Sequence, residues 1–146
     1  MILDDAQATD QAGRVLAAYV RVGDVIALSG DLGAGKTSFA RGILSGLGLG
    51  EDAPSPSFAL VIPYAPPEVQ IAVWHVDLYR LDHASEAEQL GLDDARYDSV
   101  LIIEWPERLG AGLWPEALRV HIGAQPNGGR ILTVDVPPSW KTRCPF

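Results

Sequence analysis

One short glycine-rich segment constrains the fold of this 146-residue chain more than any other feature. The segment reads Gly30-Asp31-Leu32-Gly33-Ala34-Gly35-Lys36-Thr37 and follows the apolar run 25–29, which has the pattern of a strand buried on both faces. A helical pattern comes next, which Gly48 is expected to end, and its apolar face consists of Ala40, Ile43, Leu44 and Leu47. A strand, a glycine-rich turn and a helix in this order predict an α/β unit that opens with a phosphate-binding turn.

The glycine-rich segment matches the G-x-x-x-x-G-K-[ST] pattern of a P-loop, or Walker A motif. Glycines let the backbone wrap a phosphate at positive φ, so that successive N–H groups point at the anion. The positive end of the following helix adds to this attraction. We expect Lys36 to reach the β- and γ-phosphates of a nucleotide and the Thr37 hydroxyl to ligate Mg²⁺. The alternative is a glycine-rich turn with a surface lysine.

The remaining patterns predict an α/β, single-domain, P-loop NTPase-like three-layer fold with a mixed central sheet. We expect a helix over residues 9–21 with Thr9 as its N-cap, and a short helix from a capping box at Ser85-Glu86-Ala87-Glu88 to about Gly91. Besides 25–29, the expected strands are residues 58–64, 69–77, 100–103, 118–122 and 130–136, with turns at 65–68 and at Asn127-Gly128-Gly129.

Length and charge limit the classes of protein to consider. The chain suits one domain, which we place at residues 1–136 as a P-loop domain, with a loosely held tail at 137–146. A net charge of −8 argues against direct binding to nucleic acid or to anionic membranes. A single cysteine, Cys144, and the lack of any run of ~18 apolar residues lead us to expect a cytoplasmic protein without a membrane partner.

A P-loop needs a second metal-side carboxylate at the end of a neighbouring strand, and two residues qualify. Glu104 follows the apolar run 100–103, and Asp77 ends the run from residue 69. Either residue could instead be a strand-end carboxylate in solvent. Ser55-Pro56-Ser57 is a candidate switch segment whose hydroxyl senses the γ-phosphate and metal, with a plain turn as the alternative.

Three further residues are weaker candidates. His75 is two residues before Asp77, hence on the same strand face, and is predicted to orient that carboxylate or to be structural. Trp105 is predicted to project to the face opposite Glu104, where packing or a partner contact is more natural than catalysis. Arg130 either approaches the nucleotide or is an ordinary strand-end arginine.

Four ordered motifs together resemble one family. They are the P-loop, Ser55-Pro56-Ser57-Phe58, His75-Val76-Asp77-Leu78-Tyr79-Arg80-Leu81 and Glu104-Trp105-Pro106-Glu107-Arg108. Their order and approximate spacing are similar to those of the TsaE (YjeE) family, the small bacterial P-loop ATPases of tRNA threonylcarbamoyladenosine (t6A) biosynthesis. The resemblance covers about residues 9–135.

The resemblance implies an ATPase that uses ATP and Mg²⁺ and acts with the TsaD and TsaB proteins, reaching tRNA only indirectly through that complex. The implied phosphate cradle consists of Gly33, Ala34, Gly35, Lys36, Thr37 and Ser38. The implied metal ligands are Thr37 and Glu104, and the candidate catalytic residues are Lys36, Asp77 and Glu104. Gly129 and Arg130 are the implied contacts near the nucleotide.

One position departs from the family pattern. The family usually has threonine where this chain has Ser57, so the hydroxyl is kept while the methyl group that restricts χ1 is lost. We therefore list Ser57, with His75 and Trp105, among the switch and partner candidates. The net charge of −8 agrees with docking on a basic surface of TsaD or TsaB.

Three other functions compete with this interpretation. A P-loop small-molecule kinase usually brings several arginines over the phosphates, and no arginine-rich insertion is present. A GTPase normally uses an Asn-Lys-x-Asp segment, whereas the only asparagine, Asn127, precedes a glycine. The third is a nucleotide-gated binding module without meaningful turnover.

Overall fold

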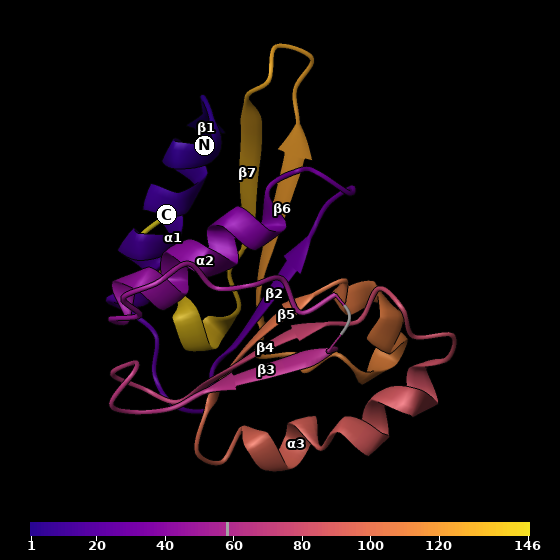
Figure 1. Ribbon diagram of the computed structural model, residues 1–146. Helices are drawn as coiled ribbons and strands as arrows, with labels where there is room; N and C mark the ends of the chain where they lie inside the picture. The colour runs from indigo at the N-terminus through magenta and orange to yellow at the C-terminus, as the bar shows by residue number, and fades with distance from the viewer. Residues whose placement is uncertain (58) are drawn as a thin grey trace.

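The computed structural model describes residues 1–57 and 59–146, which form one mixed α/β domain (Figure 1). In this part of the chain, seven strands build one sheet in the order β1-β7-β6-β2-β5-β4-β3. The strands are β1 (Ile2–Leu3), β2 (Val25–Ser29), β3 (Val61–Tyr64), β4 (Val73–Asp77), β5 (Val100–Glu104), β6 (Leu118–Ala124) and β7 (Arg130–Asp135).

The centre of the sheet is parallel and its two edges are antiparallel, which confirms the predicted mixed sheet. Strands β6, β2, β5 and β4 run in the same direction, so their carboxyl ends meet at one edge. In the register of β4 and β5, Asp77 lies beside Glu104, and Leu28 of β2 flanks Glu104 on the other side. Ligands of α/β proteins bind at such a carboxyl edge.

Both predicted hairpins are present, with different bounds for the first. Strand β3 pairs with β4, but the connection spans residues 65–72 rather than 65–68, because β4 begins only at Val73. The predicted first strand included Phe58, which lies outside the described residues. Strands β6 and β7 pair around Asn127-Gly128-Gly129 as expected.

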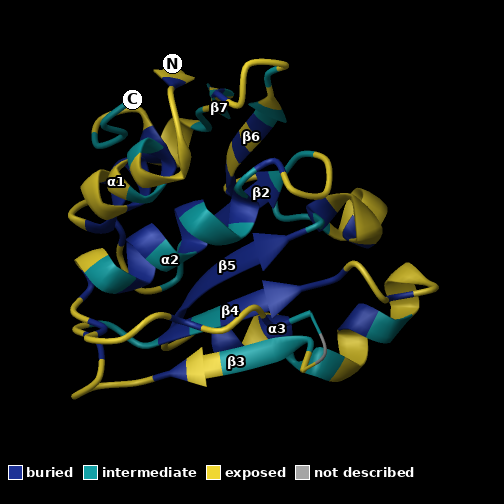
Figure 2. Ribbon diagram, turned by 45° about the horizontal axis from the view of Figure 1, so that its top comes forward, coloured by how far each residue is buried: buried dark blue, intermediate teal, exposed yellow. Residues whose placement is uncertain are grey.

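Helices cover both faces of the sheet, which completes the predicted three layers (Figure 1). Helices α1 (Ala6–Ala17) and α2 (Lys36–Gly46) pack on one face. The 3₁₀ helix η1 (Ala84–Leu90), helix α3 (Leu92–Ala95) and the 3₁₀ helix η2 (Pro106–Gly112) pack on the other. Figure 2 shows β5 as a buried strand between these layers, in agreement with its continuous apolar run.

Glycines bring α1 and α2 into close contact. A side chain at Gly13 would collide with the backbone carbonyl of Phe39, and one at Gly42 would collide with that of Asp10. The two helices therefore pack backbone against backbone at these points. Because α2 carries Lys36 and Thr37 in its first turn, this contact also fixes where the glycine-rich loop joins the domain.

Two predicted helix starts are wrong. Helix α1 begins at Ala6 and ends at Ala17, and its N-cap is Asp5, whose Oδ1 accepts the Ala8 N–H at 2.8 Å. Thr9 is instead buried within the helix, where its hydroxyl donates to the Asp5 carbonyl at 3.1 Å. The segment with the expected capping box is a 3₁₀ helix that begins at Ala84 and has no side-chain cap.

The expectation of a loosely held C-terminal tail is also wrong. Trp140, in the short 3₁₀ helix η3 (Pro138–Trp140), is fully buried in the core beneath α1 and α2. Arg143 makes two hydrogen bonds of 2.6 Å with the Asp24 carboxylate, and the Phe146 ring centroid lies 6.4 Å from that of Phe39. Buried aromatic area and a bidentate ion pair hold the tail against the domain.

Within residues 1–57 and 59–146, no helix has the length and apolar character needed to cross a membrane.

Candidate functional site

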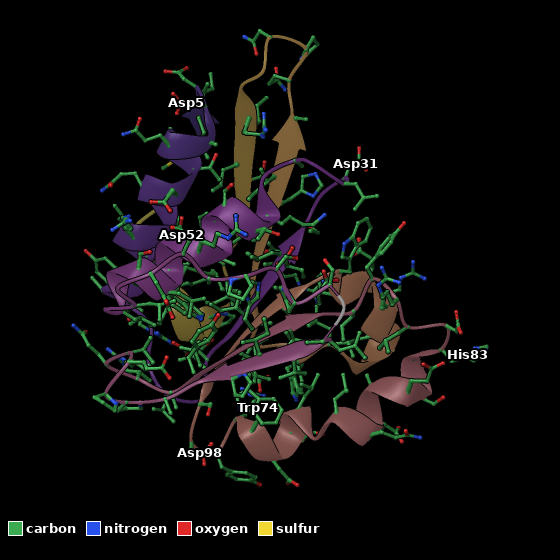
Figure 3. The ribbon with its side chains drawn as sticks, viewed as in Figure 1. Asp5, Asp31, Asp52, Trp74, His83 and Asp98 are labelled. Atoms are coloured by element: carbon green, nitrogen blue, oxygen red, sulfur yellow. The ribbon has the colours of Figure 1, made fainter. Side chains whose placement is uncertain are left out.

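The glycine-rich loop, residues 30–35, leaves the carboxyl end of β2 and enters α2 at Lys36. Gly30, Gly33 and Gly35 have positive φ, and a side chain at Gly30 would also collide with the Ile122 carbonyl on β6. Asp31 lies at the outer tip of the loop (Figure 3). The loop thus passes over the first turn of α2, where backbone N–H groups have no partner within the helix.

Lys36 folds back onto this loop. Lys36 is only 5% exposed. Its Nζ donates hydrogen bonds to the backbone carbonyls of Gly30 and Asp31, and the distance from Nζ to the Asp31 oxygen is 3.2 Å. The ammonium also sits 4.0 Å from the ring centroid of Trp105. Burial lowers the pKa of Lys36 below its ordinary value, and nearby carboxylates, Glu104 foremost, oppose this shift. A bound anion would favour the charged form of this lysine.

Two buried carboxylates face the loop from the ends of β4 and β5. Glu104 is 3% exposed, and its Oε1 accepts a hydrogen bond from Thr37 Oγ1 at 3.0 Å. Asp77 is 5% exposed, and its Oδ2 accepts a hydrogen bond from Ser57 Oγ at 3.2 Å. Its Oδ1 accepts the Tyr79 N–H at 2.9 Å. The parallel register therefore places two carboxylates and two hydroxyl groups at one point of the sheet edge.

His75 contacts a different carboxylate from the one predicted. Its Nε2 forms a hydrogen bond of 2.7 Å with Glu104 Oε2, while Asp77 is held by Ser57 and by the Tyr79 N–H. His75 and Asp77 do share a strand face, but the neighbouring strand brings Glu104 within reach of the imidazole. The ring is fully buried, and its Nδ1 has no hydrogen-bond partner among the described residues.

The expectation that Trp105 projects away from the site is wrong. Trp105 has φ of 60°, a left-handed conformation that ends β5 and breaks the alternation of side chains along a strand. Its ring therefore turns toward the loop, against Lys36 and at a centroid distance of 4.9 Å from Tyr79. Tyr79 was not among the predicted site residues, although it lies two positions after Asp77.

Arg130 connects the β6–β7 hairpin to the loop. Its Nη2 donates to the Gly33 carbonyl at 3.4 Å, and its Nη1 donates to the Gly128 carbonyl at 2.6 Å. Its Nε is buried without a partner among the described residues and lies beside Gly35. An N–H donor of this kind is suited to an anion held by the loop.

These groups surround one cavity of about 240 Å³. Its lining consists of Leu32, Gly33, Gly35, Lys36, Thr37, Ser38, Ser57, Asp77, Glu104, Trp105 and Arg130. Three predicted residues are not part of this lining: Ala34 is buried in the core, His75 contacts Glu104, and the Gly129 N–H donates to Asn127. Leu32, which is 68% exposed, was not predicted because it occupies a variable position of the motif.

The donors and acceptors of this cavity suit a magnesium nucleotide. Lys36 and Arg130 supply cationic N–H groups next to the glycine-rich loop. Thr37 and Glu104 supply the oxygen ligands that Mg²⁺ prefers, and Mg²⁺ usually completes its shell with waters and phosphate oxygens. The residues present therefore fit the group that the sequence motif implies.

The fold and the site together define a class of protein. Proteins of this class consist of a single mixed α/β domain in which a glycine-rich loop and two buried carboxylates meet at the carboxyl edge of a mixed sheet. Within that class, this chain belongs to the TsaE family, since residues 3–132 match the family described as "Threonylcarbamoyl adenosine biosynthesis protein TsaE". The family expected from the four motifs is confirmed.

Individual relatives agree with this family. The tRNA threonylcarbamoyladenosine biosynthesis protein TsaE of Treponema pallidum is 33% identical over 88% of this chain and 94% of the relative. The protein of the same name from Streptomyces coelicolor is 41% identical over 77% of this chain and 76% of the relative. The crystal structure of YdiB from Bacillus subtilis has a TM-score of 0.81 at 28% identity, covering 97% of this chain and 88% of that chain.

Proposed function

We propose that this protein binds and hydrolyses ATP with Mg²⁺ as part of the machinery that makes t6A in tRNA. The observation that carries the proposal is the hydrogen bond between Thr37, at the start of α2, and Glu104, at the end of β5. In a P-loop enzyme, a hydroxyl and a carboxylate at these two places hold the metal of the nucleotide. The membership of the TsaE family supports the link to t6A biosynthesis.

Each side chain of the cavity has a role in this proposal. The backbone of Gly33, Ala34 and Gly35 and the first turn of α2, including Ser38, hold the phosphates. Lys36 exchanges the carbonyls of Gly30 and Asp31 for phosphate oxygens. Arg130 binds the same anion from the hairpin side, with Gly129 beside it.

Hydrolysis depends on the two buried carboxylates. Thr37 and Glu104 would hold Mg²⁺, which would neutralise the charge that develops on the phosphates. Asp77 orients the attacking water. The hydroxyl of Ser57, which is hydrogen-bonded to Asp77, changes its contacts when the γ-phosphate is present and so makes the segment around Ser57 a switch. His75 holds the Glu104 side chain in place through its 2.7 Å hydrogen bond.

We further propose that the protein acts on a complex of TsaD and TsaB and reaches tRNA only through that complex, in the cytoplasm. The net charge of −8 supports contact with basic protein surfaces rather than with RNA. ATP binding or hydrolysis would reset the partner complex between modification cycles, with slow hydrolysis by the protein alone. In single- and multiple-turnover modification assays, omission of the protein should spare the first turnover and stop later ones.

The decisive experiment measures ATP turnover by the wild type and by Lys36→Ala, alone and with the TsaD–TsaB complex. We expect the complex to stimulate the wild type, and we expect Lys36→Ala to lose both nucleotide binding and stimulated turnover. If the wild type neither binds the complex nor responds to it, the proposed partnership is wrong. Transfer of phosphate to a metabolite in a substrate panel would instead favour a small-molecule kinase.

A further inference from the structure

A second cavity, of about 730 Å³, lies on the face of the sheet opposite α1 and α2. It is bounded by η1 and α3 on one side and by η2 and the following residues on the other. Buried apolar side chains, including Ala87, Leu92 and Leu109, form part of its wall, and Trp114 adds an aromatic surface. None of its lining residues belongs to the cavity at the glycine-rich loop.

The rim of this cavity is strongly acidic. Glu88, Asp93 and Asp94 line it and are exposed. The segment 82–98 that contains them has six carboxylates and a single arginine, Arg96, and thus carries most of the net charge of the chain. Arg96 is already engaged by Glu116 at 2.7 Å. Figure 3 labels His83 and Asp98, which mark the two ends of η1 and α3. We call this cavity the acidic pocket.

Aromatic surface continues beyond the acidic pocket. A neighbouring cavity shares Asp93 and Trp114 with it and extends to Tyr97, which is 86% exposed. Trp114 is oriented by a hydrogen bond from its Nε1 to Asp93 Oδ1 at 2.7 Å. Exposed aromatic side chains next to an apolar hollow are typical of protein–protein interfaces.

We infer that the acidic pocket is a docking site for a basic segment of a protein partner, which inserts an apolar side chain between η1 and η2. This inference rests on the proposed function, because it supplies the contact through which TsaD–TsaB would reach this chain. Charge complementarity selects a basic protein surface and disfavours the phosphate backbone of tRNA. The apolar wall provides the area that a purely ionic contact lacks.

The position of the acidic pocket also connects docking to the proposed chemistry. Helix η2 begins at Pro106, directly after Trp105 and two residues after Glu104, and Leu109 of η2 lines the pocket. Trp105 in turn contacts Lys36. A partner that presses on η2 therefore acts on a segment continuous with the carboxylate and with the ring that holds the lysine.

Charge reversal and obstruction of the acidic pocket test the inference. Glu88→Lys combined with Asp94→Lys reverses two rim charges, and Ala111→Trp obstructs the cavity without changing its charge. The matched control, Glu51→Lys combined with Asp52→Lys, makes the same charge change at exposed residues outside the lining. Each variant is titrated with purified TsaD–TsaB at two salt concentrations, with a fluorescent ATP analogue, and with tRNA alone.

We expect both pocket variants to bind TsaD–TsaB about tenfold more weakly or worse and to lose stimulated ATP turnover, while basal turnover and nucleotide affinity stay at wild-type values. The control should stay within about threefold of the wild type, and the double reversal alone should reduce the salt dependence. Wild-type affinity in both pocket variants would overturn the inference and leave the proposed function intact. If the wild type binds nucleotide but not TsaD–TsaB, both the proposed partnership and the docking role of the acidic pocket are wrong. If the wild type binds tRNA and only the pocket variants lose that binding, the choice of a protein as the partner is wrong.

Discussion

Thr37 and Glu104 are 67 residues apart in the sequence, yet Thr37 Oγ1 donates a hydrogen bond to Glu104 Oε1 at 3.0 Å. The contact exists because β2, which leads into the glycine-rich loop, is the parallel neighbour of β5, which ends at Glu104. Asp77 joins them from β4, on the other side of β5. Three consecutive strands of the sheet thus deliver the groups on which the proposed chemistry depends.

The first prediction concerns Glu104. Glu104→Gln keeps the size of the side chain but removes the charge proposed to hold Mg²⁺, so we expect ATP turnover to fall by about 10²–10³-fold. Nucleotide binding without Mg²⁺ should remain near the wild-type value. Mg²⁺ titrations of turnover and of nucleotide affinity provide the measurement.

Glu68→Gln is the matched control for this change, because Glu68 is exposed, does not line the cavity and is not among the carboxylates that act on Lys36. We expect its turnover to stay within about threefold of the wild type. Equal ATP turnover in Glu104→Gln and the wild type would show that Glu104 does not hold the metal.

The second prediction concerns Arg130. Arg130→Ala removes the guanidinium whose Nε lies beside Gly35 with no hydrogen-bond partner in the described part of the chain. We expect nucleotide affinity to fall by about 10-fold, since a charge-assisted hydrogen bond to the nucleotide is lost. Titration with a fluorescent ATP analogue measures the effect. Arg119→Ala, an exposed arginine of β6 outside this cavity, is the control. Equal losses in the two variants would indicate a general charge effect instead.

The third prediction concerns the contact between α1 and α2. Gly42→Ala places a methyl group against the Asp10 carbonyl, and we expect it to lower the free energy of unfolding by about 2 kcal/mol despite the better helix propensity of alanine. Gly50→Ala, at a position with open space around it, should change stability by less than about 0.5 kcal/mol. Urea denaturation of both variants measures their free energies of unfolding. A Gly42→Ala protein more stable than the wild type would contradict the close packing of the two helices.

The fourth prediction concerns the C-terminal tail. Trp140→Ala should lower the free energy of unfolding by about 3–5 kcal/mol, because it empties a fully buried site in the core. Lys141→Ala, at the exposed neighbouring position, should leave stability within about 0.5 kcal/mol of the wild type. Thermal unfolding followed by circular dichroism measures both. Equal midpoints for Trp140→Ala and the wild type would show that the tail contributes little to stability.

Local patterns were sufficient where neighbouring residues decide the structure. Strand β2, the glycine-rich loop and α2 follow from an apolar run, three glycines at positive φ and a helical period, all within 25 consecutive positions of the chain. The β6–β7 hairpin follows from its turn residues in the same way. The fold class could therefore be predicted from the sequence before any distant contact was known.

Contacts between distant residues decided the rest. The sequence by itself determined which residues are chemically suited to the site, because the spacing of the glycines, Lys36 and Thr37 is a local property. Only the tertiary structure decided that His75 pairs with Glu104, that Trp105 turns toward Lys36, and that Trp140 closes the core. The pairing of His75 depends on the order of the strands, the direction of the Trp105 ring on the left-handed backbone of that residue, and the position of Trp140 on the burial of distant apolar surface. None of these three causes is specified by the neighbouring residues in the chain.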